Sequence, residues 1–163
     1  IWIYRELYAK RLTADALADA IYELEANDPP MYASVLDKSC WNRIAGAPSV
    51  AQTMIEKGIR RLPSNSDRLS GKLELHKRLQ LNEDSGEARL KIFENCTNII
   101  RTLPAIPLSR TNSEDVDTRS EDHAYDALRY MCMLRQLNNT NFNTWSNRIK
   151  DSAPEPRDMV FGY

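Results

Sequence analysis

The chain has 163 residues, of which 42% are apolar and 28% charged, with a formal net charge of −1. These proportions are ordinary for one soluble globular domain, and the near-zero charge excludes a global basic field, so any contact with nucleic acid needs a local patch. No apolar run approaches the roughly 18 residues that span a bilayer, and we expect no membrane contact.

The hydrophobic pattern predicts an α/β protein. An opening segment rich in β-branched and aromatic residues is followed by a helical period and then by a second apolar run, MYASVL. Strand, helix and strand in this order are typical of a sheet covered by helices. In chain order we expect strand 1–9, helix 13–26, strand 31–36, helices 49–59 and 72–81, strand 88–93, and helices 96–103 and 118–131. We expect residues 1–133 to form the domain and residues 134–163 a C-terminal extension or tail.

The last of these helices, TRSEDHAYDALRYM, has a cluster of chemically active side chains near its start. Ser120 is a candidate N-cap. Asp122 and Asp126 stand four residues apart and His123 and Asp126 three apart, so each pair can converge on one spot. Two carboxylates and an imidazole can hold a divalent ion, Mg²⁺ preferring oxygen ligands and Mn²⁺ accepting histidine more readily. The alternative is an acid-rich first turn that stabilises the helix dipole and stays in water.

A further acid, Asp37, directly follows the second predicted strand. In sheets of this kind, ligands and catalytic groups tend to lie at the carboxyl ends of strands. Asp37 is therefore a candidate site residue, with a simple turn cap as the alternative.

The densest basic zone extends across the two central helices. It comprises Lys57, Arg60, Arg61, Arg68, Lys72, Lys77 and Arg78, and the candidates for DNA binding are Arg60, Arg61, Arg68, Lys72 and Lys77. Several cations in one zone can follow a phosphate backbone locally, and an ordinary solvated face is the alternative.

Other chemistries find no support in the pattern. Cys40, Cys96 and Cys132 are far apart and form no CxxC pair, which favours reduced thiols and a cytoplasmic setting over a zinc site. The sequence has no GxxxxGK phosphate loop, no GxSxG elbow and no HExxH pair.

Several segments together resemble the C-terminal nuclease domain of tailed-bacteriophage terminase large subunits, the DNA-packaging motors. The matching segments, in the family's order, are IYRELYAKRLTADAL, VLDKSCWNR, APSVAQTMIEKGI, SDRLSGK, LKIFENCTNIIRTLP and EDVDTRSEDHAYDALRY. The likeness covers residues 1–131, and its closing motif is the most specific part.

The resemblance implies an RNase H-like mixed sheet flanked by helices and a nuclease that cuts concatemeric viral DNA with two metal ions, Mg²⁺ or Mn²⁺. By the family's motifs, Asp37 matches the acid at the end of a central strand, and His123 and Asp126 match a pair on the last helix, with Asp122 beside them. SDRLSGK matches a loop facing the DNA. Two cations held about 4 Å apart by such acids would activate the water and stabilise the leaving oxygen. The implied partners are double-stranded viral DNA, the terminase small subunit and the portal protein, in the cytoplasm of the host bacterium.

The chain departs from the family at its start. The family's first catalytic aspartate lies on a strand ahead of the region matching residues 1–9, and the motor ATPase domain is not among these residues. Two functions therefore stay open. One is a metal-dependent endonuclease domain, either cut down from a longer packaging protein or completed by another chain. The other is an inactive DNA-binding or docking fragment. A third reading is another RNase H-like enzyme, such as a Holliday-junction resolvase.

Overall fold

The computed structural model describes residues 1–29, 33–43 and 46–134, which form an α/β fold with short strands. The α-helices are α1 (Ala14–Glu25), α2 (Val50–Glu56), α3 (Arg68–Leu79), α4 (Thr97–Thr102) and α5 (His123–Leu134), with 3₁₀ turns η1 (Lys38–Trp41) and η2 (Leu103–Ala105). The strands are β1 (Trp2–Ile3), β2 (Val35–Leu36), β3 (Leu62–Pro63) and β4 (Lys91–Ile92). The predicted α/β class is confirmed at this level, while most of the expected tail, residues 135–163, lies outside the described part.

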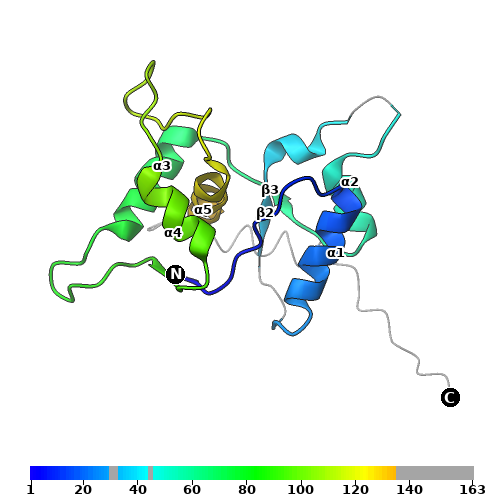
Figure 1. Cartoon of the computed structure of the whole chain (residues 1–163), viewed down its shortest axis with the longest axis horizontal. Coiled ribbons are helices and arrows are strands. Elements are labelled where there is room, and N and C mark those ends of the chain that lie inside the picture. The colour runs from blue at the N-terminus through cyan, green and yellow to red at the C-terminus, as the bar shows by residue number, and fades with distance from the viewer. Residues whose placement is uncertain (30–32, 44–45, 135–163) are drawn as a thin grey trace.

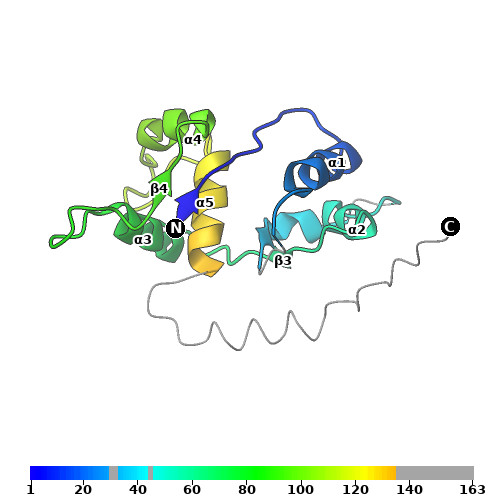
Figure 2. The same ribbon diagram turned by 90° about the horizontal axis from the view of Figure 1, so that it is seen from below.

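The elements form two groups, visible side by side in Figure 1: α3, α4 and α5 in one, and α1, α2, β2 and β3 in the other. The first group has a core around Leu75, Tyr125 and Leu128, and the second a smaller core around Ala18 and Met54. Helix α5 packs on α3 and α4 and also contacts β2, so it connects the two groups. Figure 2 shows the extended segment after β1 passing from the first group to α1 in the second.

The strands pair differently from the expected sheet. In the described residues β1 pairs in parallel with β4, and β2 pairs in parallel with β3, so β1 and β2 belong to separate two-stranded sheets. Among the described residues, the regular ladder of each pair covers two residues on each strand. β3 was not predicted, since Leu62–Pro63 has no alternating pattern and owes its strand conformation to β2.

The helix boundaries also differ from the prediction, for local reasons. α3 begins four residues earlier than expected because the Asp67 carboxylate caps it, accepting from Ser70 N at 3.0 Å. α5 begins at His123 rather than near Ser120, whose hydroxyl instead donates to Asp117 O at 2.5 Å. A side-chain cap thus decided the start of α3.

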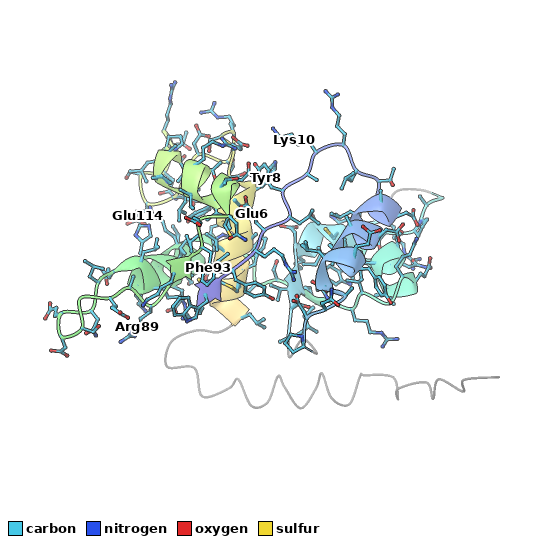
Figure 3. All side chains as sticks on the ribbon, turned by 60° about the horizontal axis from the view of Figure 1, so that its bottom comes forward. Glu6, Tyr8, Lys10, Arg89, Phe93 and Glu114 are labelled. Carbon is cyan, nitrogen blue, oxygen red and sulfur yellow. The ribbon has the colours of Figure 1, made fainter. Side chains whose placement is uncertain are left out.

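The N-terminal segment is held by long-range hydrogen bonds. The Glu6 carboxylate accepts from the backbone nitrogens of Asn98 and Ile99, at 2.7 and 3.0 Å, and so caps the start of α4. Tyr8 donates to Glu121 at 2.7 Å. Figure 3 shows Glu6 and Tyr8 on this segment, beside the group that contains α4 and α5. These bonds position the segment next to the start of α5.

Candidate functional site at the end of β2 and the start of α5

Asp37 lies at the carboxyl end of β2 and reaches α5. Its carboxylate accepts from Ser39 N at 2.7 Å, which caps η1, and from the hydroxyl of Tyr130 on α5. Burial alone would raise the pKa of Asp37, but the hydrogen bonds from Ser39 and Tyr130 outweigh it and hold the pKa below its usual value. Both interpretations of Asp37 from the sequence therefore describe real contacts: it caps a turn, and it faces the helix that carries the other acids.

Asp122, directly before α5, and Asp126, in its first turn, have different surroundings. Asp122 is only 7% exposed, and burial, followed by the nearby charge of Asp126, raises its pKa. Asp126 Oδ1 accepts from Arg129 Nε at 3.1 Å and Nη2 at 3.0 Å, and lies 3.5 Å from Arg68 Nη1. Asp122 and Asp126 interact electrostatically, and guanidinium groups already neutralise Asp126.

His123 lies at the margin of this cluster. Its side chain is 82% exposed, and Nδ1 is 3.9 Å from Asp122 Oδ1. It lines a largely apolar cavity of about 360 Å³ between the N-terminal segment, α4 and α5. His123 is thus accessible to solvent and has a weak contact with only one of the predicted acids.

Arg129 is the structural centre of the acidic site. It is 1% exposed, and besides Asp126 its Nη1 donates to Asp67 O at 3.2 Å. A Cβ atom at Gly71 would lie 2.3 Å from Arg129 Cγ, so only glycine lets this side chain cross α3. Gly71 of the SDRLSGK segment therefore has a packing function.

A second guanidinium, that of Arg68, links Asp126 to the polar connector, residues 107–118, that precedes α5. Its Nε donates to Asp115 Oδ2 at 2.7 Å. Tyr125 is 3% exposed, its hydroxyl has no hydrogen-bond partner among the described residues, and burial raises its pKa to about 12. Asp115 and Tyr125 thus join Arg68, which the sequence predicted only as a DNA-binding residue, in this network.

The predicted ligands do not fit a metal ion in their present arrangement. The described residues contain no group of three or more His, Cys, Asp or Glu side chains placed to hold one. Asp37 is occupied by Tyr130, Asp126 is bound by two guanidiniums, and His123 points to solvent. We therefore derive no step of chemistry through a metal at this site.

The predicted DNA-binding cations are largely engaged within the molecule. Arg61 binds Glu25 through two contacts of 2.6 and 2.8 Å, and Lys77 lies 3.0 Å from Glu74. Lys72 donates to the backbone oxygen of Glu114 at 2.7 Å. Arg68 is part of the acidic network described above, and Arg60 is adjacent to Arg61 at the start of β3. The zone therefore spreads over both groups of elements instead of forming one helix face.

Four functional candidates were missed from the sequence: Asp115, Tyr125, Arg129 and Tyr130. Asp126 and Arg129 stand three residues apart, so their ion pair could have been found from helical spacing. The contact between Tyr130 and Asp37 joins residues 93 positions apart, and no local pattern indicates it.

Comparison with protein-family models found no match, and neither did comparison with curated proteins or with solved structures. Among the described helices, none has the length and apolar character that a membrane crossing requires.

Proposed function

We propose that this chain is the nuclease part of a DNA-packaging protein of the terminase type, with an RNase H-like fold that cuts concatemeric viral DNA. The contact that carries the proposal is the hydrogen bond between Asp37, at the end of β2, and Tyr130 on α5. It supports the proposal because it places an acid at a strand end beside the helix that carries Asp126 and follows Asp122, and cutting of this kind uses carboxylates from different elements.

The cofactors of the proposal are two Mg²⁺ or Mn²⁺ ions. Because the described residues hold no complete ligand set, further oxygen ligands have to come from outside them or from another chain. Double-stranded viral DNA, the terminase small subunit, the portal protein and the host cytoplasm belong to the same proposal and rest on the sequence motifs alone.

A second candidate function is a catalytically inactive DNA-binding or docking fragment. The observation that favours it is the pairing of Asp126 with Arg68 and Arg129, which neutralises this acid without any metal. This function predicts DNA binding that weakens with salt, as phosphate contacts do, and no cleavage.

Incubation of supercoiled plasmid with the protein in Mn²⁺ separates the two functions. The nuclease proposal predicts nicked and linear products, and their loss in Asp37→Asn. Asp19→Asn is the matched control, because Asp19 is an acid paired with Lys57 in the α1–α2 group, and it should leave cleavage unchanged. Salt-dependent binding without cleavage by the wild-type protein would support the inactive fragment instead. Cleavage confined to four-way junctions would indicate a resolvase.

A further inference from the structure

The two-stranded sheet of β1 and β4 has one face in the core and one face toward solvent. Four residues of the two strands and their flanks pack against the core: Ile1, Ile3, Leu90 and Ile92. Neighbouring residues of a strand point to opposite faces, so Trp2 and Phe93 lie on the other side, where they are 61% and 46% exposed. Their rings meet edge to face with centroids 5.8 Å apart. They form one exposed aromatic surface, which we call the Trp2–Phe93 face.

Two cations accompany the rings. Lys91 is opposite Trp2 in the strand pair, with its Nζ 5.0 Å from the centre of the Trp2 ring and 2.6 Å from a carboxylate oxygen of Glu87. Arg89 lies two residues earlier and is exposed, and its side chain makes no hydrogen bond or ion pair within the described part of the chain. Figure 3 shows Arg89 and Phe93 in the part of the molecule next to β1. Lys91 is therefore partly engaged, whereas Arg89 is available to an anion from outside.

Arg89 also lines a polar hollow of about 410 Å³ at the end of α3 and the loop after it. Lys77 contributes a second cation to this lining, and Glu83 and Asp84 contribute two acids. Lys77 is already bound to Glu74 at 3.0 Å. Because the charges of the hollow cancel, it can hold few phosphates. A ligand of this part of the surface must therefore gain most of its affinity from the two rings.

Exposed rings beside a few cations are the chemistry that holds single-stranded nucleic acid, because every base has a flat face that stacks on an aromatic ring. We propose that the Trp2–Phe93 face binds single-stranded DNA, with bases stacked on the two rings and phosphates on Arg89 and Lys91. A duplex keeps its bases stacked on one another and offers this surface only its phosphates. None of these residues belongs to the candidate site at Asp37 and α5. The choice of DNA over RNA rests on the proposed function.

The first test measures binding of a fluorescently labelled strand of about twelve thymidines to the complete chain by anisotropy. Trp2→Ala and Phe93→Leu should each weaken binding about fivefold or more, because each removes a ring on which a base stacks. Phe93→Tyr keeps a ring and should bind as wild type does. Tyr22→Ala is the matched control, since Tyr22 is an equally exposed ring on α1, in the other group of elements, and it should leave the affinity unchanged. Equal affinities of Trp2→Ala, Phe93→Leu and wild type would overturn the inference.

The second test uses only the wild-type protein and does not depend on the folding of a variant. Two phosphate contacts predict a slope of about −1.4 for the logarithm of the affinity against the logarithm of the salt concentration, and a duplex of the same length should bind at least about tenfold more weakly. A duplex bound as tightly as the single strand, or a much steeper slope, would overturn the inference and assign binding to the basic zone.

Two further outcomes would assign the Trp2–Phe93 face to another partner. Tighter binding of a uridine strand than of the thymidine strand would overturn the choice of DNA. Self-association in sedimentation that Trp2→Ala removes, without binding of either strand, would assign the face to a second copy of the chain. Failure of the nuclease proposal is distinguishable, because it concerns plasmid cleavage: a protein that binds the thymidine strand through Trp2 and Phe93 but cuts nothing keeps this inference and loses the nuclease.

Discussion

Replacement of Gly71 by alanine tests the packing of Arg129 most sharply. The new Cβ would lie 2.3 Å from Cγ and 2.7 Å from Cδ of Arg129. These atoms are near the root of a side chain that is 1% exposed, so a simple rotation of its far end cannot relieve the clash.

The magnitude follows from three effects. Alanine is favoured over glycine in a helix by about 1 kcal/mol. Overpacking a buried site costs about 1–3 kcal/mol, and separating Arg129 from the Asp126 carboxylate that it binds at 3.0 Å would raise the loss toward about 3–5 kcal/mol. Subtracting the helix preference of about 1 kcal/mol from a loss of about 3–5 kcal/mol leaves about 2–4 kcal/mol, and we therefore expect Gly71→Ala to lower the free energy of unfolding by that amount.

Urea unfolding followed by circular dichroism measures this loss. Leu73→Ala is a control on the same helix, because Leu73 is exposed, and it should change stability by no more than about 0.5 kcal/mol. In an Arg129→Ala background, which lacks both of the clashing carbons, the loss caused by Gly71→Ala should be smaller. A Gly71→Ala protein as stable as wild type, or more stable, would refute the packing argument.

Two further predictions concern single acids. Glu6→Gln should lower the free energy of unfolding by about 0.5–1 kcal/mol at neutral pH, because it weakens the cap of α4. The pKa of Glu6 lies below its usual value of 4.5. The difference from wild type in urea titrations should therefore vanish as the pH falls through that lowered pKa. Asp122→Asn should raise stability at neutral pH by about 0.5–1 kcal/mol, since burial and then Asp126 raise the pKa of Asp122 and its ionised form therefore opposes folding. The wild-type protein should lose that part of its stability as the pH rises from the ordinary pKa of 3.8 through the raised one, and a variant less stable than wild type at pH 7 would contradict this account.

Local chemistry explains what the sequence predicted well. The positions of the helices follow from apolar periodicity, and the ion pair of Asp126 with Arg129 has the spacing of one helix turn. Asp37 was chosen because it follows an apolar run, and the structure places it against α5. These inferences need only neighbouring residues or one strand end.

Long-range contacts explain what the sequence could not predict. The extent of each strand depends on its partner, and the partners are far apart in the sequence: β1 pairs with β4, and β2 pairs with β3. Arg68 was expected to face DNA, yet an acid 47 positions away, Asp115, binds it. No periodicity carries that information, because it depends on how α3 and the connector before α5 meet in space.

The central claim is that the end of β2 and the helix α5 form one site, joined by Asp37 and Tyr130. A double-mutant cycle with Asp37→Asn, Tyr130→Phe and the combined variant measures the coupling free energy between these two side chains in urea unfolding at neutral pH. We predict a coupling of about 1 kcal/mol or more, as for residues in direct contact. Effects that add within about 0.3 kcal/mol would mean that the two side chains do not interact, and would contradict the account.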